Sequence, residues 1–234
     1  MLIKPHGGKR RGAGRPAKGA RAGAPHKKRP GLAARHPVHV VLRASASIGN
    51  LRRQIAYQAI RTATITIAKR EDFRIIQLSV QRTHIHLIVE ANDKLALAKG
   101  MQGFQISAAK HLNAAISAAV RQPRRRGAVF PDRYYAVMIT SPRQARNVLC
   151  YVLGNWRHHQ EDLGPSMQTW RIDWLSSAIA FPGWAEHGDV ANLWRGPANW
   201  MPLHVREPQT WLLREGWKKH GATISCDEVP ASAS

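Results

Sequence analysis

A run of alternating side chains, from His84 to Glu90, constrains the fold of this chain more than any other stretch. Apolar residues occupy every second position, at Ile85, Leu87 and Val89. This period of two predicts a strand that turns an apolar face to a core and sets His84 and His86 on the opposite face. The two histidines are then roughly 6–7 Å apart along the strand, so their rings can converge on one ion. For an isolated His-x-His pair, two half-exposed strand histidines beside an ordinary apolar face would be the favoured interpretation, and the segments that follow reverse this preference.

The segments around this strand predict an antiparallel sheet with helices. Runs rich in β-branched residues indicate the strands, and apolar positions at helical spacing indicate the helices. Strands are expected at 38–43, 73–80, 84–90 and 129–139, and helices at 51–67, 94–120 and 141–159. This order is typical of the ferredoxin-like split βαβ arrangement, an α+β fold with helices on one face of an antiparallel sheet.

The last of these helices has a well-marked beginning. Ser141 can cap it, Pro142 suits the first helical position, and Gln144 can complete a capping box. Further along, Tyr151 and Asn155 are one helical turn apart and therefore share a face. If the helix crosses the sheet, this face places a phenol and an amide beside the histidines. A tyrosine that merely packs under the sheet is the alternative.

The balance of charge points to a polyanionic partner. The chain of 234 residues carries 36 Lys and Arg against 14 Asp and Glu, a formal net charge of +22, and no acidic residue precedes Glu71. Such an excess favours nucleic acid, through phosphate contacts and counterion release. No apolar run approaches the length of a membrane span. The two cysteines, Cys150 and Cys226, are far apart and give no disulfide framework, so a reducing cytosol is the expected compartment.

Changes in amino-acid composition divide the chain into three parts. Residues 1–35 hold eleven Lys and Arg, no acid and much Gly, Ala and Pro, and are expected to be a disordered basic arm. Residues 36–160 contain the predicted sheet and helices and form the main domain. Residues 161–234 form an extension with most of the eight tryptophans, which all follow residue 155. These rings are expected to anchor an irregular extension against the main domain.

The histidine strand and the last helix together resemble a known family. Residues 83–90 resemble the His-hydrophobe-His motif of HUH endonucleases, and residues 147–155 resemble their single-tyrosine nucleophile helix. Residues 99–104 and 129–135 are also similar to this group. The resemblance covers residues 36–160 in order and spacing, and is greatest to the transposases of small insertion sequences, particularly the REP-associated tyrosine transposases. The chain departs from them in its arm, its extension, and Trp156, where relatives commonly have proline.

The resemblance implies a site and a reaction. His84, His86 and Asn155 would hold Mg²⁺ or Mn²⁺, and Tyr151 would attack one phosphate of single-stranded or hairpin DNA. The products would be a 5′-phosphotyrosine and a free 3′-hydroxyl that can reverse the reaction on another strand. Imidazole and amide ligands alone would equally admit Zn²⁺, so the choice of ion rests on the family. The family also implies a bacterial-type, nucleoid-associated transposase or a domesticated relative, with monomer and homodimer both open.

The remaining basic residues are candidates for contacts with DNA. They lie in the arm, in the loop after the second helix, before the fourth strand and on the last helix, at Arg15, Arg124, Arg125, Arg126, Arg133 and Arg157. Packing is the expected role of Tyr134 and Tyr135 on the fourth strand, and solvation that of Glu90.

A different class of function also suits this fold. Ferredoxin-like sheets serve as non-catalytic single-stranded DNA- or RNA-binding modules, which stack bases on aromatic residues of their central strands. The third strand of this chain carries histidines in place of such aromatics. The sequence therefore favours the enzyme.

Overall fold

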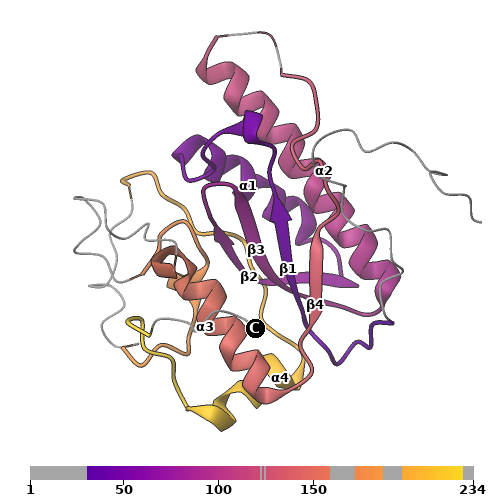
Figure 1. Ribbon diagram of the computed structural model, residues 1–234, viewed down its shortest axis with the longest axis vertical. Helices are drawn as coiled ribbons and strands as arrows, with labels where there is room; N and C mark the ends of the chain where they lie inside the picture. Colours follow the sequence, from indigo (N-terminus) through magenta and orange to yellow (C-terminus); the bar gives the residue numbers. More distant parts are fainter. Residues whose placement is uncertain (1–30, 122, 124, 159–171, 187–196, 229–234) are drawn as a thin grey trace, which may run out of the picture.

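The computed structural model describes residues 31–121, 123, 125–158, 172–186 and 197–228 (Figure 1). A four-stranded antiparallel sheet in the order β2-β3-β1-β4 forms its centre. The strands are β1 (Val38–Arg43), β2 (Phe73–Val80), β3 (His84–Ala91) and β4 (Tyr135–Met138). Helix α1 (Gln54–Ile67) joins β1 to β2, and α2 (Lys94–Ala119) joins β3 to β4. This connectivity and strand order confirm the predicted ferredoxin-like α+β fold.

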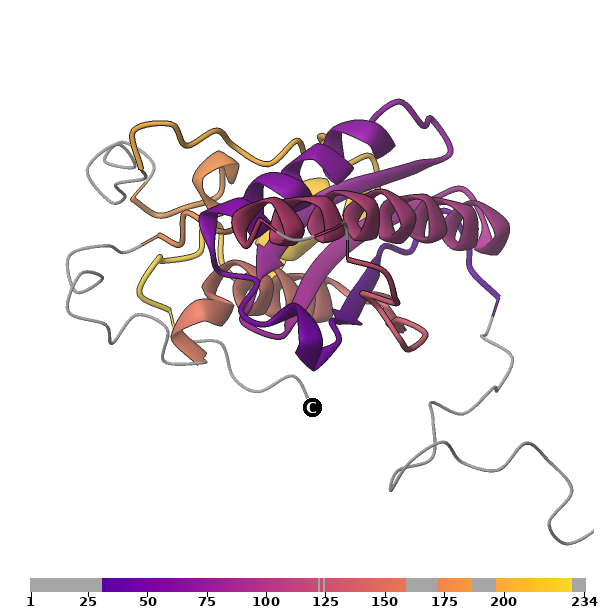
Figure 2. The same ribbon diagram turned by 90° about the horizontal axis from the view of Figure 1, so that it is seen from above.

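The two faces of the sheet pack against different elements. On one face, alternate residues of β1, β2 and β3 meet α1 and α2 in the main core, which includes Ile85, Leu87 and Val89. On the other, Ile76 and Ile88 form a second core with α3 (Pro142–His158) and segments that follow residue 171. Figure 2 shows α1 and α2 on one side of the sheet and α3 on the opposite side. The histidines of β3 thus lie on the α3 face.

The start of α3 has the predicted Ser141 cap, but the side chain of Gln144 binds a different amide from the one predicted. Ser141 Oγ accepts a hydrogen bond from the amide of Gln144 at 3.2 Å. The side chain of Gln144 reaches one residue further back than a capping box requires, because its Oε1 accepts from the Thr140 amide at 2.8 Å. Both interactions satisfy amide groups near the helix start that have no partner within the helix.

The fourth strand is shorter than predicted. The sequence indicated a strand from 129 to 139, whereas β4 pairs with β1 only over Tyr135–Met138. Pro131 lacks the amide hydrogen that a strand interior uses, which limits the pairing. Val129 nevertheless stays buried, and its carbonyl accepts a hydrogen bond from the Ser45 amide at 2.7 Å.

The described part of the C-terminal extension contacts both cores. Trp184 and Trp217 are buried in the second core, and Trp174 and Trp200 pack against the main core. The extension also covers the outer edge of β2, because the Ser177 amide donates to the Leu78 carbonyl at 2.8 Å. This contact occupies a strand edge that would otherwise have open hydrogen-bonding groups. The extension therefore supports the edge of the sheet as well as α3.

Two buried carboxylates connect the extension to the main domain. Asp173 pairs with Arg52 through two hydrogen bonds of 2.9 Å. Glu90 accepts hydrogen bonds from the amides of Gln209 and Thr210, both at 2.9 Å. Glu90 is only 1% exposed, so the expectation that it is solvated was wrong. The donors that bury it come about 120 positions later in the sequence, where no local pattern reveals them.

Several expectations fall on residues outside the described ranges. They include nearly all of the predicted basic arm, residues 159–171 at the end of the main domain and the start of the extension, Trp170 and Trp194. Among the helices that the structure describes, none combines the length and apolar character needed to cross a bilayer.

The buried pair of Arg52 and Asp173 gives a test of how the extension is held. Asp173→Ala should lower the free energy of unfolding by about 3–5 kcal/mol, because it leaves a buried guanidinium without its charge partner. Asp72→Ala breaks the partly exposed pair with Arg70 and serves as a control, with an expected loss below about 1 kcal/mol. Urea denaturation of both variants measures the difference. Equal losses would show that the Asp173 pair does not anchor the extension.

Candidate metal and nucleophile site

The two histidines of β3 approach each other through their ring nitrogens. His84 Nε2 and His86 Nε2 are 2.9 Å apart, with His86 buried and His84 half-buried. Two nitrogens bound at ~2.1 Å to one ion, at a right angle, are about 3.0 Å apart. The pair therefore has the spacing of two ligands of a single ion.

The second ring nitrogen of each histidine, Nδ1, also contacts a neighbouring side chain. His86 Nδ1 lies 3.1 Å from Nε2 of His39 on β1, and His84 Nδ1 lies 3.2 Å from the Thr83 hydroxyl. Burial lowers the pKa of His39 to about 4, so its imidazole is neutral near pH 7 and its Nε2 can accept a hydrogen bond from Nδ1–H of His86. In that tautomer the Nε2 lone pair of His86 points toward His84 Nε2, where both nitrogens could bind one ion. His39 thus orients His86.

Helix α3 brings the predicted nucleophile to these rings. It packs against β2 and β3. The ring of Tyr151 stands edge-on to His86, with ring centres 5.2 Å apart and an interplanar angle of 89°. It also stands edge-on to His39, at 5.9 Å. The structure therefore assembles a phenol and two convergent imidazoles from a helix and a strand that are about 65 residues apart.

Asn155 lies one turn beyond Tyr151 on α3 and is fully buried. Neither its amide oxygen nor its amide nitrogen has a hydrogen-bond partner in the described part of the chain. A buried amide without partners carries a desolvation cost of ~1–3 kcal/mol. A ligand that binds the amide oxygen would remove part of this cost. The donor set of two imidazoles and one amide fits a divalent ion.

Comparison with known proteins decides the family. Residues 33–155, more than half of the chain, match the sequence model described as transposase, IS200 like. The chain belongs to the IS200-like transposase family. Membership confirms the enzyme class that the motifs predicted, an HUH single-tyrosine DNA transposase. DNA processing of the transposase type is therefore the activity of this chain.

Two solved structures are similar to the transposase. One is a REP-associated tyrosine transposase bound to a REP hairpin, with 15% identity, a TM-score of 0.49, and coverage of 80% of this chain and 100% of that chain. The other is a protein of Deinococcus radiodurans R1 assigned as a transposase, with 13% identity, a TM-score of 0.37, and coverage of 59% and 95%. No curated protein matches the sequence.

The two tyrosines before and within β4 differ in their surroundings. Tyr134 packs against the main core, as expected for it. Tyr135 is 66% exposed, so the expectation of packing was wrong for this residue. Alternation along the strand explains the difference, because adjacent side chains point to opposite faces. The sequence predicts this alternation, but the exposure of Tyr135 also depends on the position of α3.

The arginines proposed to contact DNA have varied environments in the transposase. Arg126 and Arg133 are exposed. Arg125 donates to Asn113 Oδ1 at 2.7 Å and also to Ser47, and Arg157 pairs with Asp227 at 3.0 Å. These two side chains therefore bind other parts of the protein. The remaining candidates, Arg15 and Arg124, lie outside the described residues.

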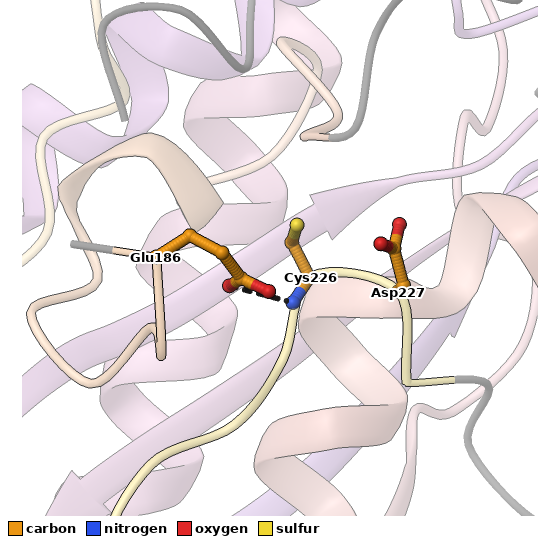
Figure 3. A group of neighbouring side chains, drawn as sticks. All are labelled: Glu186, Cys226 and Asp227. Atoms are coloured by element: carbon orange, nitrogen blue, oxygen red, sulfur yellow. Dashed lines mark hydrogen bonds between the residues drawn. The ribbon is translucent and has the colours of Figure 1, made fainter. Parts of the chain in front are cut away.

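A second group of potential ligands lies in the extension. Ligand atoms of Glu186, Cys226 and Asp227 lie within 4.8 Å of one another (Figure 3). Glu186 already accepts hydrogen bonds from the Ser225 hydroxyl at 2.7 Å and from the Cys226 amide at 3.1 Å. Burial opposes its ionisation, but these hydrogen bonds outweigh the burial and lower the pKa of Glu186. The group joins two segments of the extension to each other and, through Asp227, to α3.

The orienting role of His39 can be measured without catalysis. His39→Phe keeps a planar ring in the same place but removes the nitrogen that contacts His86. We expect Mn²⁺ to bind this variant about 10–100-fold more weakly, the usual effect of losing such a partner. Electron paramagnetic resonance of free Mn²⁺ gives the affinity. His204→Phe, at an exposed position of the extension, is the control. Unchanged affinity in both variants would contradict the role of His39.

Proposed function

We propose that this transposase cleaves and rejoins single-stranded DNA at hairpin-forming repeats, with Tyr151 as the nucleophile. His84, His86 and Asn155 would hold the divalent ion, Mg²⁺ or Mn²⁺. One observation carries this proposal: the phenol ring of Tyr151 stands against His86, whose Nε2 faces that of His84 at 2.9 Å. The nucleophile and the bound ion would then act on the same phosphate.

The reaction conserves the number of phosphodiester bonds. The Tyr151 oxygen attacks phosphorus, the bond from phosphorus to the 3′-oxygen breaks, and the phosphate remains on the tyrosine as a 5′-phosphotyrosine. The phenol loses a proton and the departing 3′-oxygen gains one. Attack by a 3′-hydroxyl on the phosphotyrosine reverses these steps, so joining needs no ATP. Attack in line with the departing oxygen requires that the phenol oxygen be held in a fixed position.

The chain's own residues supply that position. The packing of α3 against β2 and β3 fixes the phenol beside the histidines. His39 keeps the Nε2 of His86 turned toward His84. A bound divalent ion would polarise the phosphate and offset the charge that develops on it.

The proposed substrate follows from charge and exposure. The net charge of +22 favours a polyanion, and exposed arginines such as Arg126 and Arg133 offer contacts to phosphates. A tyrosine that must reach a phosphate in line with its leaving group is served best by a strand free of a duplex. A hairpin can present such a strand at its foot.

Covalent trapping tests the nucleophile. Wild-type protein is incubated with Mn²⁺ and a pool of hairpin oligonucleotides that have randomised single-stranded flanks, and adducts are separated on a denaturing gel. We expect the wild type to form an adduct. Tyr151→Phe should form none, because it keeps the ring and lacks only the attacking oxygen. It should still bind the pool, since basic residues supply most of the affinity. An adduct at the normal rate in Tyr151→Phe would mean that another residue attacks.

Substitution of a ligand tests the ion separately. His86→Ala should abolish adduct formation and leave binding of the hairpin pool largely intact, because a phosphate contact is lost but the basic surface remains. His111→Ala, on α2 at the opposite side of the sheet, is the control and should react as the wild type does. The gel assay, repeated with a chelator, gives the same comparison for the wild type. Equal cleavage by all these samples would rule out the proposed metal site.

A further inference from the structure

The site face of the sheet continues from the histidines to the β4 edge. Strand pairing places His86 opposite Val41, and Val41 opposite Tyr135. Directly paired residues of antiparallel strands project to the same face. Tyr135 therefore shares the face of His86, two strands away, which is about 10 Å at the spacing of neighbouring strands.

This half of the face is open in the described part of the chain. Helix α3 packs against β2 and β3, and every residue of β2 is buried. On β4, by contrast, Tyr135 is exposed and the other three residues are only half-buried. Figure 1 shows β4 at the edge of the sheet, beside β1. A large aromatic side chain thus lies open to solvent on the same face as the histidines.

The same face of the sheet also carries a positively charged side chain. Arg43, the last residue of β1, pairs directly with His84 and is exposed. Within the described residues it makes no ion pair or side-chain hydrogen bond, unlike Arg52 and Arg74, which pair with carboxylates. The face therefore carries a positive charge beside His84, at Arg43, and an exposed ring two strands from His86, at Tyr135.

We propose that the β1–β4 half of this face, from Arg43 to Tyr135, is the track that receives the unpaired DNA strand beside the scissile phosphate. Tyr135 stacks on a base, and Arg43 contacts a neighbouring phosphate. The proposal rests on the proposed function and adds to it the path of the strand. At a stacked rise of ~3.4 Å per nucleotide, the stacked base lies within about three nucleotides of the phosphate that Tyr151 attacks.

This combination suits a single strand better than a duplex. Stacking on a protein ring needs a base with an open face, which a continuous duplex does not offer. Every base has such a face, so a ring of this kind tolerates many sequences. The charge of Arg43 adds attraction that weakens with salt. The track therefore selects unpaired DNA without dictating the base.

Photo-crosslinking tests the track independently of cleavage. The full chain, kept in chelator, is irradiated with a thymidine oligonucleotide that contains one 5-iododeoxyuridine. We expect the crosslink in the tryptic peptide 134–143, at Tyr135. Tyr135→Ala should lose the crosslink and bind the oligonucleotide about 5–150-fold more weakly, the range found for loss of base stacking. Tyr135→Phe should keep both.

Matched controls separate this effect from general ones. Trp211 is also an exposed aromatic residue, but it lies on α4 (Trp211–Arg214) in the extension, and Trp211→Ala should bind as the wild type does. Arg43→Gln should reduce the slope of log affinity against log salt by about 0.7, the value for one phosphate contact of a single strand. Lys99→Gln, on α2 across the sheet, should leave the slope unchanged.

The outcomes distinguish this proposal from the proposed function. Wild-type binding by Tyr135→Ala, together with normal adduct formation, would overturn the track and leave the function standing. A crosslink at Tyr135 without any covalent adduct in the wild type would support the track and contradict the function. A change in sedimentation caused by Tyr135→Ala, with DNA affinity unaltered, would show that the exposed ring contacts a second copy of the chain, and would overturn the track.

Discussion

The packing of α3 against β2 and β3 is the contact on which the site depends, because it brings Tyr151 to the histidines. The C-terminal extension supports this contact from behind. Trp217 and Leu213 are buried in the second core with α3, and Arg146 of α3 pairs with Glu228 at 2.8 Å. Burial of such large apolar side chains is the main favourable term in folding. Tyr151 itself packs against this core, so Trp184 and Trp217 of the extension help to stabilise the position of the nucleophile.

One face of the sheet supplies the main core, and the opposite face carries the candidate reacting groups. Alternate side chains of β3 enter the main core, while His84 and His86 turn to the opposite face. Helix α3, which packs on that face, carries the buried amide of Asn155, and this amide has no hydrogen-bond partner among the described residues. The apolar face and the second core offset the cost of burying this amide, which lets the site keep groups available for a ligand.

Local patterns predicted the parts of the structure that are held by local forces. The period of two around His86 and the helical spacing before Tyr151 gave the elements, and their order gave the ferredoxin-like topology. Partners that are distant in sequence could not be predicted in this way. The burial of Glu90 by residues 209 and 210 appears only when the sheet and the extension assemble.

Peptide mapping of the covalent adduct identifies the nucleophile directly. Trypsin cuts after Arg146 and Arg157, so Tyr151 is the only tyrosine in peptide 147–157, whereas Tyr134 and Tyr135 share peptide 134–143. Mass spectrometry of the digested adduct, formed with Mn²⁺ and hairpin DNA, should find the nucleotide on peptide 147–157 through a 5′-phosphate. A nucleotide on peptide 134–143 would contradict the account and move the reaction to the edge of the sheet.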